Sequence, residues 1–141
     1  TSLVDAPVIP DSVLDMSEAF LGDSNIYTAS AFPESVEDIS SAYADCISLE
    51  KAASIPASVI NCDSCYSGCS NLYGELSINT NTEDCANLLS NAVTSGKTLK
   101  LKGKSGRLFE IQQDSGSRYV TIKDTEKAEK NAKKLERQNN Q

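Results

Sequence analysis

The chain has 141 residues, of which 39% are hydrophobic and 6% aromatic, which suits one domain with a modest core. It contains no histidine, so the Ser-His and Cys-His pairs of common hydrolytic mechanisms are excluded. No apolar run approaches the length of a membrane span, and no signal peptide is visible.

The net charge of −7 is unevenly divided along the chain. Residues 1–92 carry 14 acidic side chains and one basic side chain, Lys51, which gives −13. Residues 93–141 carry 12 basic and six acidic side chains, which gives +6. The acidic field of the first part argues against nucleic acid as its partner. The basic part could contact the acidic part of another copy, or it could be a solvated tail.

The first two thirds of the chain repeat with a period of 23 residues. Four units align without a gap, at 1–23, 24–46, 47–69 and 70–92. Apolar residues recur at the third and ninth positions of the units: Leu3, Ile26, Leu49, Leu72 and Ile9, Phe32, Ile55, Ile78. A unit of this length cannot bury its own apolar positions, so neighbouring units must cover them. The sequence therefore predicts an α/β-type solenoid, a leucine-rich-repeat stack of four 23-residue coils.

Each unit is expected to contain a short strand, a turn and a return segment. The strand should lie near the third to ninth positions, as from Leu49 to Ile55, and Pro56 should close it because proline lacks a ladder donor. An alanine and an aromatic residue should fill the far wall of the core. An acidic or amide column should cap a turn by accepting backbone N–H bonds: Asp15, Asp38, Asn61 and Asp84.

The third unit reads L-x-x-A-x-x-I-P-x-S-V-x-x-C-x-x-C-Y-x-G-C-S-N-L. This pattern resembles the BspA-type bacterial leucine-rich repeat, whose units share an I-P-x-S-V core and an aromatic residue followed by G-C-x-x-L. The resemblance covers residues 1–92 and is weakest in the fourth unit, where Asn79 and Thr82 replace proline and valine. It implies a binding array without catalytic residues. It also implies an extracellular, cell-surface or virion location, on a bacterial or phage-associated protein.

All five cysteines lie in the repeat, and three of them form the pattern Cys62-x2-Cys65-x3-Cys69. In isolation this spacing would indicate a metal or iron–sulfur site. The alignment instead places Cys62, Cys65 and Cys85 in columns that elsewhere hold apolar side chains. Free stacked thiols are therefore favoured, and one disulfide or a metal site are the alternatives. A disulfide would join Cys46 to Cys69 or Cys62 to Cys85, which a stack would place about 4.8 Å apart.

Shorter patterns replace the period after residue 92. The alternation of lysine and apolar residues from Lys97 to Gly103 predicts a strand with its leucines inward. A short helix is expected from about Ser105 to Gln113, and a second strand from Ser117 to Lys123. Residues 93–123 would then form a strand-helix-strand C-terminal cap over the last coil.

Residues 124–141 are charged and rich in helix formers, which predicts a polar helical tail with Asp124 or Thr125 as its N-cap. The apolar stripe of this helix is too thin to hold it to the core. Its only apolar side chains are Ala128, Ala132 and Leu135.

Signals for catalysis and for cofactors are scarce. The thiols have no general base beside them, and Gly103–Arg107 lacks the spacing of a phosphate-binding loop. Stacked carboxylates could hold Ca²⁺ between coils, but D-x-D-type ligand loops are absent. We therefore expect no enzyme activity, no cofactor and no metal.

Binding through the strand face is the favoured function. Tyrosines on an exposed face offer amphipathic contact area, although they could also simply pack along the strands. The sequence thus indicates a recognition or adhesion module for a protein or glycan. The candidate patch, just after the consensus leucine of the units, consists of Tyr27, Thr28, Glu50, Lys51 and Tyr73, with Val4 and Asp5 in the first unit.

A structural role is the alternative function. The domain would then belong to a larger extracellular or virion assembly, or associate with itself, through its basic tail or its uncapped first coil. Because no polar cap precedes the first coil, further repeats are expected upstream.

Overall fold

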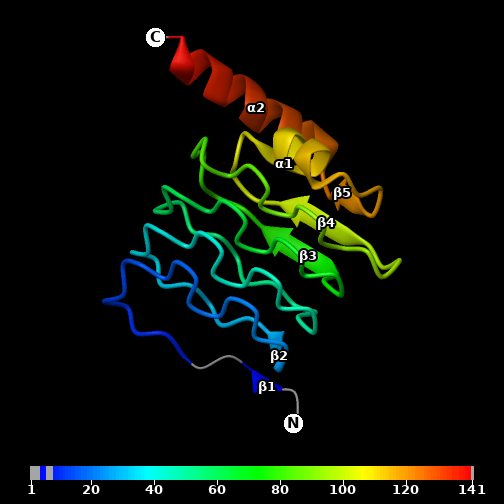
Figure 1. Ribbon diagram of the computed structural model, residues 1–141. Coiled ribbons are helices and arrows are strands. Elements are labelled where there is room, and N and C mark those ends of the chain that lie inside the picture. The colour runs from blue at the N-terminus through cyan, green and yellow to red at the C-terminus, as the bar shows by residue number, and fades with distance from the viewer. Residues whose placement is uncertain (1–3, 6–7, 141) are drawn as a thin grey trace.

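The computed structural model describes residues 4–5 and 8–140. Its elements in chain order are β1 (Val4–Asp5), β2 (Ile26–Thr28), β3 (Gly74–Ser77), β4 (Leu99–Lys102), α1 (Leu108–Ser115), β5 (Val120–Ile122) and α2 (Thr125–Asn139). Strands β3, β4 and β5 form one parallel sheet in that order, and β1 pairs with β2 in parallel. Figure 1 shows β1 and α2 at opposite ends of the molecule, with the three-stranded sheet between them.

The predicted stack of four equivalent coils is wrong. The described residues form a small α/β structure whose largest sheet has three strands, and two of these, β4 and β5, lie after the four units. Residues 29–73, all of which the structure describes, contain turns and isolated bridges but no strand. Short strands form in the first, second and fourth units, but the third unit has none and contributes only single bridges such as Thr28↔Lys51 and Ile55↔Ile78.

Tyrosine hydroxyls explain part of this interruption. The Ser30 N–H donates to the Tyr43 hydroxyl (3.0 Å), and the Ala53 N–H donates to the Tyr66 hydroxyl (2.9 Å). These N–H groups would otherwise be available to a neighbouring strand. Because the buried tyrosines bond them instead, the ladder is broken where the sequence pattern predicted its continuation.

Segments one period apart are still neighbours through single backbone bonds. The Phe20 N–H donates to the Ala42 carbonyl (2.8 Å), and the Tyr43 N–H donates to the Cys65 carbonyl (2.9 Å). In Figure 1 successive passes of the chain lie side by side below the sheet. The period therefore indicates which segments meet, although it does not indicate strands.

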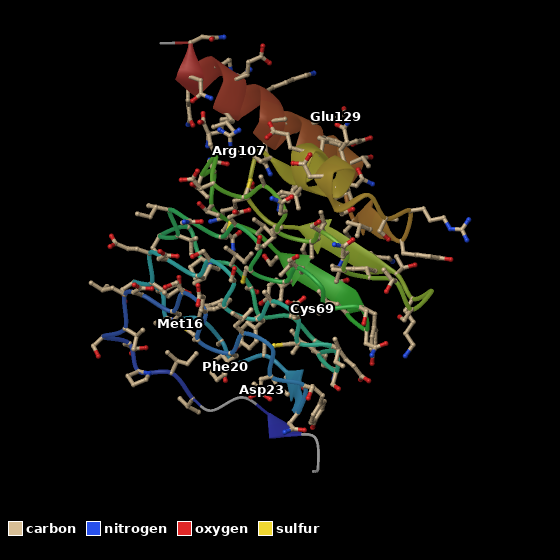
Figure 2. The ribbon with its side chains drawn as sticks, in the orientation of Figure 1. Met16, Phe20, Asp23, Cys69, Arg107 and Glu129 are labelled. Carbon is tan, nitrogen blue, oxygen red and sulfur yellow. The ribbon has the colours of Figure 1, made fainter. Side chains whose placement is uncertain are left out.

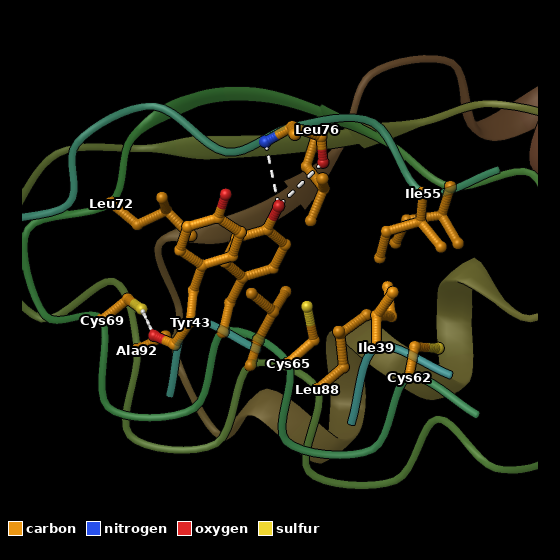
Figure 3. Close-up of a cluster of buried hydrophobic side chains, with 14 of the residues drawn as sticks. Ile39, Tyr43, Ile55, Cys62, Cys65, Cys69, Leu72, Leu76, Leu88 and Ala92 are labelled. Atoms are coloured by element: carbon orange, nitrogen blue, oxygen red, sulfur yellow. Dashed lines mark hydrogen bonds between the residues drawn. The ribbon is translucent and has the colours of Figure 1, made fainter. Parts of the chain in front are cut away.

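The core is built from the apolar columns of the sequence (Figure 3). Nine of the residues expected in these columns are buried: Ile26, Phe32, Leu49, Ile55, Cys62, Cys65, Leu72, Ile78 and Cys85. Cys46 and Cys69, which share a mixed column, are buried as well. Ile9 is only partly buried, and Leu3 lies outside the described residues. Aromatic rings line one wall, since Tyr43 stacks on Tyr66 with ring centroids 5.7 Å apart and on Phe20 at 5.0 Å.

All five cysteines are buried free thiols, so neither candidate disulfide is formed. The Cys69 thiol donates to the Tyr43 carbonyl (3.0 Å), and the Cys46 thiol donates to the Phe20 carbonyl (3.1 Å). Burial raises the pKa of Cys46 to about 11 and that of Cys62 to about 12. These thiols are protonated at neutral pH and act as small apolar groups with a weak donor.

The C-terminal segments contain the expected elements near the expected residues. Leu99 and Leu101 of β4 point into the core, and α1 begins at Leu108, three residues later than the sequence suggested. Asp124 caps α2 by accepting from the Lys127 N–H (3.0 Å).

The expectation that α2 cannot pack on the core is wrong. Ala128 is only 2% exposed, and the Asn131 side chain donates to the Gly103 carbonyl (3.2 Å). Gly106 allows this contact, because a Cβ at this position would lie 2.7 Å from the Asn131 carbonyl oxygen and 2.8 Å from Leu135 Cβ. Because Gly106 and Ala128 are both small, α2 packs closely on the core although its apolar stripe is narrow.

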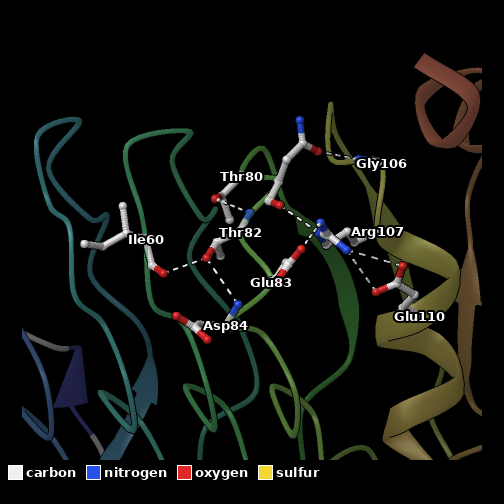
Figure 4. A network of polar contacts seen from close by, with 9 residues as sticks. Ile60, Thr80, Thr82, Glu83, Asp84, Gly106, Arg107 and Glu110 are labelled. Atoms are coloured by element: carbon white, nitrogen blue, oxygen red, sulfur yellow. Dashed lines mark hydrogen bonds and ion pairs between the residues drawn. The ribbon is translucent and has the colours of Figure 1, made fainter. Parts of the chain in front are cut away.

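A polar cluster around Arg107 joins the fourth unit to α1 (Figures 2 and 4). The Arg107 Nε–H donates to the Asn81 carbonyl (2.7 Å), and the guanidinium also pairs with Glu110 (3.4 Å) and Glu83 (3.7 Å). Thr82 donates its hydroxyl to the Ile60 carbonyl (2.6 Å). The polar residue that replaces valine in this unit is thus explained by a hydrogen bond to the preceding segment.

The hydroxyl of Tyr66 gives a direct test of this core. Tyr66→Phe should lower the free energy of unfolding by about 2 kcal/mol, because both the N–H and the carbonyl of Ala53 lose a buried partner. Tyr43→Phe should cost only about 1 kcal/mol, since its hydroxyl bonds the half-buried Ser30 N–H. Urea unfolding of the two variants measures the difference. Equal losses, or the reverse order, would contradict this account.

Candidate functional site

Three residues of the candidate patch lie on neighbouring segments. The Glu50 N–H donates to the Tyr27 carbonyl (2.8 Å), and the Tyr73 N–H donates to the Glu50 carbonyl (3.0 Å). All three residues are half-buried, so each remains partly accessible to solvent. The backbone therefore places a carboxylate between two aromatic residues.

The other two predicted residues extend the patch along the same segments. Thr28 and Lys51 form a parallel bridge, and the Ala29 N–H donates to the Lys51 carbonyl (3.0 Å). Lys51 is exposed and Thr28 is half-buried. The structure thus brings together all five residues that the sequence singled out.

The first unit joins this patch with a shifted register. Val4 pairs with Ile26 and Asp5 with Thr28, and an irregularity lies between the two pairs. The sequence alignment had placed Val4 beside Tyr27. The backbone of β1 is therefore adjacent to the patch, and the side chains of its two residues lie outside the described part.

Lys97 also belongs to the candidate patch, although the sequence did not point to it. Its Nζ lies 4.4 Å from the centroid of the Tyr73 ring, which is a cation–π contact. The alternation gave no signal for it, because Lys97 shares its register with the buried Leu99 and Leu101. It is exposed because β4 begins only at Leu99. We call Tyr27, Thr28, Glu50, Lys51, Tyr73 and Lys97 the recognition face.

A second charged group missed by sequence reasoning lies on the sheet. Glu75 of β3 accepts from Lys102 Nζ (2.9 Å) and from Lys123 Nζ (2.9 Å). Hydrogen bonds from Lys123 and then Lys102 lower the pKa of the Glu75 carboxyl to about 2. The outer side of the sheet therefore carries one shared carboxylate among several lysines.

The carboxylates of the acidic column cap turns instead of gathering at one point. The described residues contain no group of three or more His, Cys, Asp or Glu side chains that could hold a metal ion. The carboxyl of Asp15 accepts from the Ser17 N–H (2.8 Å), and that of Asp38 accepts from the Ser40 N–H (2.9 Å). Asn61 accepts in the same way from Asp63. The turn-capping role predicted for this column is confirmed at these three residues.

The part of the chain that the structure describes has no helix both long enough and apolar enough to cross a membrane. The resemblance to BspA-type repeats stays a prediction. Comparison of the chain with family models, with curated proteins and with solved structures gave no match.

Proposed function

We propose that this protein is a non-enzymatic recognition module that binds a protein or a glycan through the recognition face. The observation that carries the proposal is the arrangement of Tyr27, Glu50 and Tyr73 on three hydrogen-bonded neighbouring segments, with the Lys97 ammonium over one ring. A surface of this kind combines aromatic contact area with charged groups of both signs.

Each part of the face supports a different kind of contact. The partly accessible Tyr27 and Tyr73 can pack against a sugar ring or an apolar side chain. The Glu50 carboxylate and the Lys51 ammonium can bond hydroxyl, amide or charged groups. Because backbone bonds fix the segments relative to one another, little ordering of the backbone is needed when a ligand binds.

The setting that we propose is a bacterial cell surface or a virion, which follows from the sequence resemblance. The acidic charge of residues 1–92 supports a partner other than nucleic acid.

The proposal is tested with the double variant Tyr27→Ala/Tyr73→Ala. Labelled wild-type protein is applied to a glycan array and to a displayed library of random peptides, and its best ligand is then titrated. The double variant should bind that ligand at least about tenfold more weakly, because central aromatic contacts dominate such interfaces.

Phe109→Ala is the matched control, because Phe109 is an exposed aromatic residue on α1, outside the recognition face. The control should bind as the wild type does, and the thermal midpoint of the double variant should stay close to that of the wild type. If the double variant bound the ligand as tightly as the control, the proposed face would be wrong.

A further inference from the structure

A hollow of about 420 Å³ lies where the ends of β3 and β4 meet the start of α2. This volume is within the range of small-molecule sites, at roughly 300–1,000 Å³. Four lysines line it: Lys102, Lys104, Lys123 and Lys127. We call this site the basic hollow. None of its residues belongs to the recognition face.

Two of the four lysines have no acidic partner. Lys102 and Lys123 both pair with Glu75 (2.9 Å each), which does not line the hollow. Lys104 and Lys127 form no ion pair within residues 4–5 and 8–140. Unpaired ammonium groups around a concave surface attract an anion more strongly than the same groups on a flat surface do.

The single acidic lining residue is already engaged. The Asp124 carboxyl accepts from the Lys127 N–H at the first turn of α2 (3.0 Å). The amino-terminal end of this helix carries a partial positive charge that offsets the carboxylate. The net field in the basic hollow is therefore positive.

The rest of the lining is suited to a ligand that is more than a bare ion. Leu108 and Ala128 lie beneath the hollow and are each only 2% exposed, while the partly accessible Ser77 and Asn79 supply neutral polar groups. The hydroxyl groups of a hexose can donate to and accept from the side chains of Ser77 and Asn79.

We propose that the basic hollow binds a monosaccharide-sized ligand that carries a phosphate or sulfate ester. The ester group lies between Lys104 and Lys127, and the hydroxyl groups of the sugar lie against Ser77 and Asn79. This inference goes beyond the proposed function, because it uses a separate site with a separate ligand chemistry.

The test is a calorimetric titration at low ionic strength with glucose 6-phosphate, glucose 6-sulfate and glucose. Both esters, or one of them, should bind saturably and more weakly as salt is added, and glucose should bind at least about tenfold more weakly. The ester that binds more tightly identifies the natural chemistry. No saturable binding of either ester, or equal binding of glucose, would overturn the proposal.

Two substitutions in the lining and two outside it separate a site from general charge attraction. Lys104→Gln/Lys127→Gln should weaken binding of the ester by about tenfold, because two charge-assisted hydrogen bonds are lost. Lys130→Gln/Lys134→Gln removes the same charge from exposed positions of α2 and should change affinity less than twofold. Equal weakening by the two double variants would overturn the proposal.

Glu75→Gln should increase the affinity for the ester, an effect that misfolding of the variant would not produce. This change removes the shared carboxylate, so Lys102 and Lys123 become available to the ligand. The affinity for the ester should rise about threefold or more. An unchanged or lower affinity would contradict the assignment of these lysines to the site.

Discussion

Gly103→Ala is expected to lower the free energy of unfolding by about 3 kcal/mol or more. Gly103 has a φ of +109°, a region that side-chain-bearing residues rarely adopt. A Cβ at this position would also collide with the backbone nitrogen, carbon and oxygen of Ile78. The Ile78 backbone cannot easily move, because its N–H donates to the Lys102 carbonyl (2.9 Å) and it bridges to Ile55. Urea unfolding measures the loss.

Gly96→Ala separates the two causes. Gly96 has a similar φ of +93°, but a Cβ there would meet nothing within 4 Å. It should therefore cost about 1 kcal/mol, which is the conformational part alone. The close approach of Gly103 to Ile78 would be disproved if the two substitutions cost the same.

The second large effect is a loss of stability at alkaline pH. The pKa values of Cys46 and Cys62 rise from 9.0 to about 11 and about 12, chiefly because burial disfavours the thiolate. Burial also raises the pKa of Cys65, Cys69 and Cys85. Above pH 9 the unfolded chain releases these protons while the folded chain retains them, so stability falls with pH. Cys46 and Cys62 each subtract roughly 1.4 kcal/mol per pH unit between pH 9 and about 11.

The measurement is the free energy of unfolding in urea at several pH values between 7 and about 11, with a reducing agent present. We expect a plateau below pH 9 and a steep decline above it. Cys62→Ala removes one titrating thiol and should make the decline shallower by roughly 1.4 kcal/mol per pH unit, whatever its effect at pH 7. A stability that stays constant from pH 8 to about 11 would contradict the burial of the thiols.

The buried columns of the chain could be predicted from its sequence. A strict period shows which apolar positions must be covered by neighbouring units. Leu49, Ile55 and Leu72 were therefore expected in the core, and they are fully buried. The alternation after residue 96 predicted the leucines of β4 for the same reason. Both inferences depend on apolar periodicity, which is a local property of the sequence.

The strands and several contacts of the chain could not be predicted in this way. The position of the Tyr43 and Tyr66 hydroxyls, which bond backbone groups 13 residues away, leaves no trace in a pattern of apolar residues. Left-handed residues such as Ser64, with a φ of +61°, likewise carry no glycine signal.

The candidate site was partly predictable for a related reason. The position after the consensus leucine of each unit predicted that Tyr27, Glu50 and Tyr73 lie together. Residues one period apart occupy equivalent places on neighbouring segments. Lys97 and the lysine partners of Glu75 come from segments beyond the repeat. The pairing of Glu75 with Lys102, for example, depends on the register of β3 with β4, which only the folded chain defines.

The aromatic wall of the core also has a spectroscopic consequence. The rings of Tyr43 and Tyr66 are nearly parallel, with an angle of 9° between their planes, and the chain contains no tryptophan. Two phenols held in a fixed, chiral arrangement should couple electronically, and we expect them to dominate circular dichroism in the near ultraviolet. The unlabelled protein therefore contains its own optical reporter for the separation of these two segments.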